Sequence, residues 1–420
     1  MHLPLFLHHS SALLSEVFRW DGPVDATVAQ YGRQNAKLGS RDRALLADTV
    51  YTVLRQRLRL EALAQEGPGS PWERLALLGA GDVAQSWVEA MSAEQFAWWQ
   101  HARVQDGSSA PEPERLNLPA WLIERLRSQG VGDLDALAQA WNQAASVDLR
   151  VNVQQAKRDK VLGQMRSQDW DVEATPYSPW GLRLMQRRSL TATPWYQDGV
   201  IEVQDEGSQL LSALVGAKRG EMVADFCAGA GGKTLAMGAM MRNQGRLYAL
   251  DTSAHRLEAI KPRLKRAGLS CVYTTAMADE HDKRLQGLTQ KMARVLVDAP
   301  CSGVGTLRRS PDIKWRLKAQ DIAALAEQQQ SILTSAARLV QPGGRLVYAT
   351  CSVLREENED VAEAFAKAHP DFQMLPAEQA LSATIKDETV RQSLCSHGYL
   401  RLWPHLHNTD GFFAAVWERR

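Results

Sequence analysis

The chain has 420 residues, of which 45% are hydrophobic and 23% charged, and its net charge is +1. This length predicts two or three domains, and the charge excludes a polycation, so any nucleic-acid contact must come from local basic patches. The five cysteines are an odd and sparse set, which favours the reducing cytoplasm over a disulfide framework. No CxxC or Cys/His spacing suggests a zinc site. No apolar run is long enough to cross a membrane.

The first part of the chain is predicted to be helical. Residues 13–18 and 44–54 carry apolar side chains at helical spacing, and Ser40 is expected to cap the second of these helices. Residues 106–114 are rich in glycine, proline and serine and are expected to form a linker. We therefore predict a helical domain over residues 1–110.

Residues 119–200 are predicted to form a small α+β module. Pro119 stands near the first turn of a predicted helix, and residues 148–152 alternate like a short strand. A helix with basic side chains follows at 157–166. A solvated helix face explains these charges more readily than a nucleic-acid contact does.

From residue 201 onward, strand-like and helix-like segments alternate, the clearest helix being 321–339. Short apolar, β-rich runs occur at 222–226, 247–250, 271–274, 295–297 and 346–349. This alternation predicts an α/β domain over residues 201–420, with a parallel sheet covered by helices on both faces. A last strand at 411–417 is expected to pair at the sheet edge.

A glycine-rich loop follows the first of these strands. Residues 225–234 read DFCAGAGGKT, where Gly229, Gly231 and Gly232 permit a tight turn and close backbone approach to a ligand. The spacing fits neither a Walker A loop nor the GxGxxG fingerprint, which disfavours NAD. A purely structural strand–helix turn remains an alternative.

Two acidic residues follow the next two strands. Asp251 comes about 20 residues after the glycine loop, where a carboxylate can bind both hydroxyls of a ribose. The lack of a phosphate clamp favours an adenosyl ligand without phosphates. Asp279 is a candidate acceptor for an adenine amino group, and a helix cap is the alternative.

The richest segment, residues 298–315, reads DAPCSGVGTLRRSPDIKW. Asp298 and Cys301 follow one strand, and Cys351 ends another, so all three are expected at the ligand-binding edge of the sheet. A thiol nucleophile needs cationic or hydrogen-bonding help, for which Lys233 is a candidate. Among the residues after Cys351, Asn358 is expected to brace the cysteine turn, and its three glutamate neighbours (356, 357 and 359) to be surface or capping groups.

Together, these motifs resemble those of the RNA (cytosine-5)-methyltransferases. The similarity rests on residues 225–234, 298–315 and 348–359, with flanking matches at 203–209 and 401–413, and it spans residues 119–420. More weakly, residues 38–55 resemble the NusB-like helical domain of bacterial small-subunit rRNA enzymes. The resemblance implies a Rossmann-like S-adenosylmethionine-dependent methyltransferase domain, with the helical domain and the α+β module both binding RNA.

The resemblance also implies roles for individual residues. S-adenosylmethionine is expected to be held by Cys227, Ala228, Gly229, Ala230, Gly231, Gly232, Lys233, Asp251, Asp279 and Asp298. Ala230 departs from the family, which often has proline there. Cys351 is expected to be the nucleophile and Cys301 to assist product release, with Asp298 and Lys233 completing the catalytic set. No metal is expected.

The implied reaction is covalent. Attack of the Cys351 thiolate on C6 of cytosine makes C5 nucleophilic, and the base has to leave its stack first. Arg308, Arg309 and Lys314 are candidate phosphate contacts, and Trp315 either stacks a base or packs. The expected substrate is RNA, most readily ribosomal RNA, and the expected state is a monomer.

Three alternatives remain open. A DNA cytosine methyltransferase would place the nucleophile in the Pro-Cys turn, at Cys301. Transfer RNA is a second possible substrate. A non-catalytic RNA-binding ribosome assembly factor is the third reading, against which the intact cysteine pair and glycine loop argue.

Overall fold

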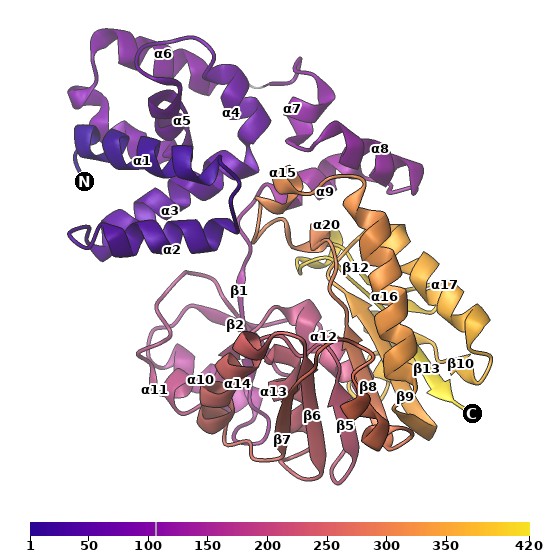
Figure 1. Cartoon of the computed structure of the whole chain (residues 1–420). Coiled ribbons are helices and arrows are strands. Elements are labelled where there is room, and N and C mark those ends of the chain that lie inside the picture. Colours follow the sequence, from indigo (N-terminus) through magenta and orange to yellow (C-terminus); the bar gives the residue numbers. More distant parts are fainter. Residues whose placement is uncertain (106) are drawn as a thin grey trace. The chain divides into compact units, whose positions relative to one another are not determined.

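The structure is a computed structural model, and it describes residues 1–105 and 107–420 (Figure 1). The chain divides into two compact units, one made of Met1–Ala144 and Thr306–Ala319, the other of Ala145–Gly305 and Gln320–Arg420. This division differs from the predicted boundaries: it falls at 144, inside the predicted 119–200 module, and it assigns 306–319 to the first unit. Asp106 of the predicted linker lies outside the described residues.

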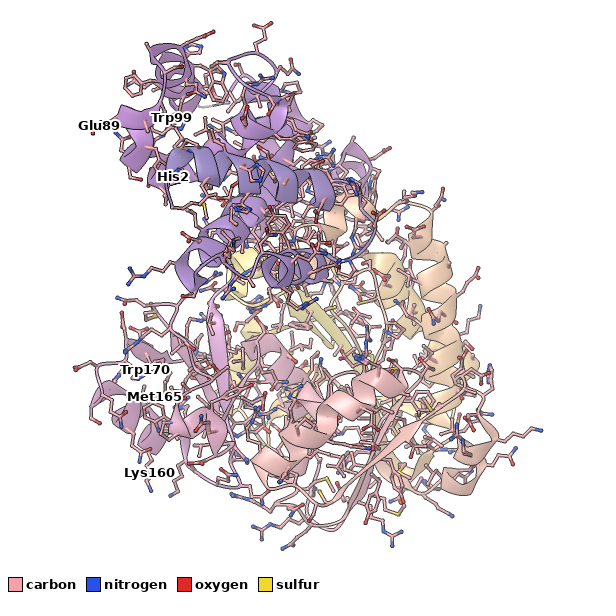
Figure 2. The ribbon with its side chains drawn as sticks, turned by 60° about the vertical axis from the view of Figure 1, so that its left-hand side comes forward. His2, Glu89, Trp99, Lys160, Met165 and Trp170 are labelled. Carbon is pink, nitrogen blue, oxygen red and sulfur yellow. The ribbon has the colours of Figure 1, made fainter. Side chains whose placement is uncertain are left out.

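The first unit is helical, as predicted. Its elements are α1 (Leu3–Val17), α2 (Val24–Gln34), α3 (Ser40–Arg55), α4 (Arg57–Leu63), α5 (Pro71–Gly79), η1 (Gly81–Ala90), α6 (Ala93–Val104), α7 (Glu112–Leu116), α8 (Ala120–Ser128), α9 (Leu134–Trp141) and α15 (Ile313–Arg316). The apolar faces of α1 to α6 bury one core, to which Trp99 of α6 belongs (Figure 2). Two local expectations were wrong: α7 begins inside the predicted linker, and Ser40 is the first residue of α3, whose N-cap is Gly39.

The second unit begins with a small antiparallel sheet of strand order β2-β3-β1-β4. The elements are β1 (Val147–Val151), α10 (Arg158–Arg166), β2 (Val172–Ala174), β3 (Gly181–Leu184), α11 (Pro194–Gln197) and β4 (Ile201–Val203). Met165 of α10 and Trp170 pack in its core (Figure 2). Within this sheet the side chain of Asp148 is buried and pairs with Arg183 at 2.7 Å.

The larger sheet has the order β11-β12-β13-β9-β8-β5-β6-β7, and β10 pairs with β13. Its strands are β5 (Met222–Asp225), β6 (Arg246–Asp251), β7 (Val272–Ala276), β8 (Met292–Asp298), β9 (Val340–Thr350), β10 (Phe372–Met374), β11 (Cys395–Ser396), β12 (Tyr399–Leu402) and β13 (Phe412–Arg419). Strands β7, β6, β5, β8 and β9 are parallel. The chain starts at β5, runs outward to β7 and then returns to β8, so the strand order reverses beside β5. Such a switch point is where α/β sheets bind ligands.

Helices cover both faces of this sheet. They are α12 (Glu206–Val215), α13 (Gly232–Met240), α14 (Ala254–Ala267), α16 (Asp321–Ala337), α17 (Glu359–Ala368), α18 (Ala377–Leu381), α19 (Glu388–Ser393) and α20 (Pro404–His407), with short 3₁₀ turns η2 (Lys283–Leu288), η3 (Val304–Thr306) and η4 (Arg355–Glu357). Successive strand residues enter different cores, as strand geometry requires: Val223 packs with α12, whereas Ala224 packs with α16 and α17. The predicted α/β class is confirmed.

One expectation about the sheet was wrong. The last strand, β13, is not at the edge, because β9 pairs with one side of it and β12 and β10 with the other. These extra strands are two to four residues long, too short to give a clear sequence signal. In the part of the chain that the structure describes, no helix is both long and apolar enough to span a membrane.

Candidate active site

The glycine loop joins β5 to α13 and presents its backbone to a cavity. Gly231 is the N-cap of α13, has a φ of +83°, and its amide donates to the carbonyl of Ala228 at 2.8 Å. A Cβ at this position would lie 2.8 Å from Cγ1 of Ile260. Both the positive φ and this close approach require glycine. The loop therefore places the N-terminus of α13 at the sheet edge.

The carboxylate of Asp251 is anchored by the backbone around it. One oxygen accepts the amide of Gly229 and the other the amide of Ser253, both at 2.7 Å. A carboxylate has about four acceptor positions, so two stay available for ligand hydroxyls. Asp279 is exposed and accepts the amide of His281 at 2.8 Å within a turn. It caps no helix, because the next helical turn, Lys283–Leu288, has Asp282 as its N-cap.

Lys233 and Asp298 form an ion pair, with Nζ 2.6 Å from Oδ2. Burial lowers the pKa of Lys233, but the charge of Asp298, its hydrogen bond and the charge of Cys351 outweigh that effect and raise the pKa overall. Lys233 therefore stays a cation. It stands between the β5 loop and the residues that follow β8.

The two cysteines that follow β8 and β9 meet at the same edge. The Sγ atoms of Cys301 and Cys351 are 3.3 Å apart. The hydrogen bond to Cys351 and then burial raise the pKa of Cys301 well above its usual value. Cys301 therefore keeps its proton at neutral pH and can donate it to Cys351.

The expectation for Asn358 is confirmed. The Thr350 hydroxyl donates to its Oδ1, and its Nδ2 donates to the carbonyl of Ser352 at 3.0 Å. These contacts hold the residues on either side of Cys351. The expectation that Glu357 is a surface or capping group was wrong, because its side chain is fully buried.

These groups surround a cavity of about 550 Å³, a volume in the range of small-molecule sites. Of the predicted residues, Cys227 to Ala230, Gly232, Lys233, Asp251, Asp298 and both cysteines line it, whereas Gly231 and Asp279 do not. Its other lining residues are Gln204, Ser208, Phe226, Thr252, Arg256, Met277, Glu280, Ala299, Pro300, Gln328 and Ile332. A backbone loop, a carboxylate and apolar side chains suit a nucleoside cofactor that carries an amino-acid arm.

Sequence reasoning assigned no role to Asp225, which does not line the cavity but directly precedes its lining residue Phe226. Its side chain is buried at the end of β5, where Oδ2 accepts the Thr234 hydroxyl at 2.6 Å and Oδ1 has no partner. Burial is the main cause that raises the pKa of this carboxyl to about 7. The sequence feature that could have indicated its burial is its position at the end of a strand, as the first residue of the glycine-loop motif.

The predicted phosphate contact of Lys314 was wrong. Its side chain is 1% exposed in the helical unit, where Nζ donates to the carbonyls of Arg55 (2.9 Å) and Asn117 (2.7 Å) and to Oδ1 of Asn142 (2.9 Å). All three ammonium protons are used, so none remains for a phosphate. Trp315 packs against the helical core and donates its indole N–H to the carbonyl of Leu54 at 2.8 Å, which favours packing over stacking on a base.

A doubly wound sheet with a glycine loop, an acidic residue at the end of β6 and this cavity defines the class of Rossmann-like S-adenosylmethionine-dependent methyltransferases. Comparison with known proteins gives the family. Residues 212–418 match the model of the 16S rRNA methyltransferase RsmB/F family, and residues 118–191 match the ferredoxin-like domain of RsmF/B-like methyltransferases.

Relatives cover most of the chain. This protein is 32% identical over 407 residues to ribosomal RNA small subunit methyltransferase B of Pseudomonas syringae pv. tomato, and the match covers 94% of this chain and 86% of that protein. It is 36% identical to the probable ribosomal RNA small subunit methyltransferase B of Bacillus subtilis, over 72% of this chain and 66% of the relative. The chain belongs to the RsmB/F family and is an RNA methyltransferase that uses S-adenosylmethionine.

Solved structures agree on the fold. The crystal structure of PH0851 superposes with a TM-score of 0.76 at 25% identity, over 98% of this chain and 97% of that one. A methyltransferase homolog protein from Pyrococcus horikoshii gives a TM-score of 0.62 at 27% identity, over 73% and 97%. Nsun6 of the same organism, solved with SFG, gives 0.61 at 19% identity, over 72% and 98%, which bears on the fold alone.

Proposed function

We propose that this enzyme methylates C5 of a cytosine in the RNA of the small ribosomal subunit, through a covalent bond between Cys351 and C6. The observation that carries the proposal is the 3.3 Å contact between the cysteines in a cavity that also holds Asp298 and Lys233. The ribosomal substrate is proposed because relatives with that printed name cover most of the chain. The helical domain and the small α+β module are proposed to bind this RNA.

The first step activates the base. Cytosine C5 is too weak a nucleophile to accept a methyl group unaided, and addition of the Cys351 thiolate to C6 makes C5 carbanion-like. Negative charge moves toward N3, which takes up, through solvent, the proton that the Cys351 thiol released, and Asp298 accepts a hydrogen bond from that N–H through its carboxylate. Lys233, paired with Asp298 at 2.6 Å, orients this carboxylate and stabilises the neighbouring thiolate.

The second step follows methyl transfer. S-adenosylmethionine, when bound, supplies an electrophilic methyl group for C5. Cys301, after giving its own proton to solvent, takes up the C5 proton as a general base, an effect worth roughly 10²–10⁴-fold in rate. The electrons of the broken C5–H bond restore the C5–C6 double bond and expel Cys351 as thiolate. Because the pKa of Cys301 is raised, its thiolate is a strong base for the C5 proton. N3 returns its proton to solvent, which leaves a neutral methylated base.

The two cysteines allow a discriminating test. We expect Cys351→Ala to abolish methyl transfer and adduct formation, whereas Cys301→Ala transfers the methyl group and accumulates a covalent protein–RNA adduct. Both are measured with radiolabelled cofactor and denaturing gels. The opposite pattern, with the adduct lost in the Cys301 variant, would assign the nucleophile to Cys301 and overturn the proposed roles.

The substrate is tested in cells. Bisulfite sequencing of 16S rRNA from cells without the protein should show one methylcytosine missing, which wild-type protein restores and Cys351→Ala does not. A site lost from transfer RNA instead would contradict the ribosomal assignment. Unchanged methylcytosine in both RNAs would contradict the proposed reaction.

A further inference from the structure

Glu357 is a buried carboxylate to which the reaction above assigns no role. It ends the 3₁₀ turn η4 between β9 and α17, its side chain is 0% exposed, and no basic side chain in the described part of the chain forms an ion pair with it. Burying a carboxyl group costs several kcal/mol unless hydrogen bonds replace its water. Its neighbours show how it is stabilised.

Four hydrogen bonds converge on this carboxylate. Oε1 accepts the backbone N–H of Ser302 at 2.7 Å and Nε2 of Gln329 at 3.1 Å. Oε2 accepts the hydroxyls of Ser302 and Ser352. Ser302 directly follows Cys301, and Ser352 directly follows Cys351. One carboxylate therefore binds the residue after each cysteine.

The two serine hydroxyls also accept backbone amides of the turns that follow the cysteines. The Ser302 hydroxyl accepts the amide of Val304 at 3.4 Å, and the Ser352 hydroxyl accepts that of Leu354 at 3.1 Å. Each hydroxyl has one proton and gives it to Glu357, so its lone pairs are free for these amides. Each serine side chain is therefore held between Glu357 and a backbone amide of its own turn.

Two further contacts fix the carboxylate in place. Gln329 of α16, which donates to Glu357, also donates to the carbonyl of Pro300 at 3.0 Å, one residue before Cys301. The Tyr348 hydroxyl donates to the backbone carbonyl of Glu357. A backbone bond from Gly305 to the carbonyl of Cys351, at 2.9 Å, also joins the turns. Loss of Glu357 should therefore misalign the turns without separating them.

We propose that Glu357 is a positioning residue that holds the two cysteine turns together, so that the thiol of Cys301 stays in contact with that of Cys351. It touches neither sulfur and acts through Ser302 and Ser352. The proposal rests on the proposed function for its effect on turnover, but the geometry it describes exists without substrate. The position of these thiols matters, because displacing a reacting group by about 1 Å can lower the reaction rate about 10²-fold.

Glu357→Gln is the informative substitution. Its amide oxygen can still accept the Ser302 N–H, but its NH₂ group cannot accept from the serine hydroxyls. We expect kcat to fall about 10–100-fold while the Kd for S-adenosylmethionine, measured by calorimetry, stays within about twofold, because no cofactor-cavity residue is changed. Glu363→Gln, the same substitution at an exposed site of α17, should leave both values unchanged.

A second readout needs no RNA. Diamide oxidises two neighbouring thiols to a disulfide, and the two electrons and two protons released reduce its azo bond to a hydrazine. We expect the 301–351 disulfide, quantified by mass spectrometry, to form quickly in wild-type protein and at least about tenfold more slowly in Glu357→Gln. Should this variant not fold, Ser352→Ala removes one of the four hydrogen bonds and should slow both reactions less.

The outcomes are distinguishable. Unchanged kcat and unchanged disulfide formation in Glu357→Gln would overturn the proposal, as would a fall in kcat matched by an equal loss of cofactor affinity. Wild-type protein without cytosine methylation would overturn the proposed function. Disulfide formation would still decide whether Glu357 holds the cysteines together.

Discussion

At the scale of single residues, the neighbours of a side chain decide its chemistry. Asp225 and Asp251 both end parallel strands, yet Asp251 is held by two backbone amides whereas Asp225 has one hydroxyl partner and an unpaired oxygen. Burial raises the pKa of Asp225 to about 7. The folded protein therefore keeps a proton on Asp225 at pH values where an unfolded chain has lost it.

This difference makes stability depend on pH. As the pH rises from about 4 to about 7, the unfolded state has lost the proton that the folded state retains, so Asp225 destabilises the fold progressively and levels off above 7. We expect Asp225→Asn to remove this loss. Its unfolding free energy relative to wild type should rise across that range, by on the order of 4 kcal/mol at most.

Urea unfolding of the full chain at several pH values measures the effect. Asp171→Asn, at an exposed aspartate, serves as the control. Its unfolding free energy plotted against pH should run parallel to that of the wild type. Parallel curves for Asp225→Asn as well would show that this carboxyl does not titrate near neutrality.

At the scale of elements, the glycine loop shows how one backbone angle builds a binding edge. We expect Gly231→Ala to destabilise the protein by about 1–3 kcal/mol, because alanine disfavours its positive φ and its Cβ would press on Ile260. Cofactor affinity should fall as well, since the displaced loop lines the cavity. Calorimetry and thermal unfolding measure both.

Gly163→Ala is the matched control. Gly163 lies within α10, and a Cβ there has no neighbour within 4 Å. This change should stabilise the protein by roughly 0.5–1 kcal/mol, because alanine favours helix. A Gly231 variant with normal cofactor affinity would mean that the loop tolerates another conformation.

The elements also show why sequence reasoning succeeded and where it stopped. The parallel strands were predictable because both of their faces are buried, which leaves uninterrupted apolar runs such as Val295–Val297. Cys301 and Cys351 were placed at one edge because both follow such runs. The position of β13 inside the sheet was not predictable, because pairing partners are distant in sequence and β11 has only two residues.

At the scale of the whole molecule, residues 306–319 leave the catalytic unit after Gly305 and belong to the helical unit. In the sequence, the basic side chains of this segment are candidate phosphate contacts. We expect Lys314→Met to lower the stability of the protein by about 2–4 kcal/mol, because three buried acceptors lose their donor. Thermal unfolding measures this loss.

The same variant separates packing from phosphate binding. The slope of log affinity for a 16S rRNA transcript against log salt concentration should stay at the wild-type value, whereas loss of a phosphate contact would reduce it by about one. Lys37→Met, at an exposed lysine of the same unit, is the control for stability and should leave unfolding unchanged. A reduced slope with unchanged stability would restore the predicted phosphate contact.

The sequence by itself determined the α/β class, the glycine loop, the acidic residue after β6 and both cysteine turns, because each depends on local spacing and on strand ends that meet at one edge. Only the tertiary structure decided what a charged side chain faces. Glu357 and Lys314 look like surface residues in sequence, yet both are buried, because hydrogen-bond partners up to 259 residues away replace their water. Such partners leave no periodic signal along the chain.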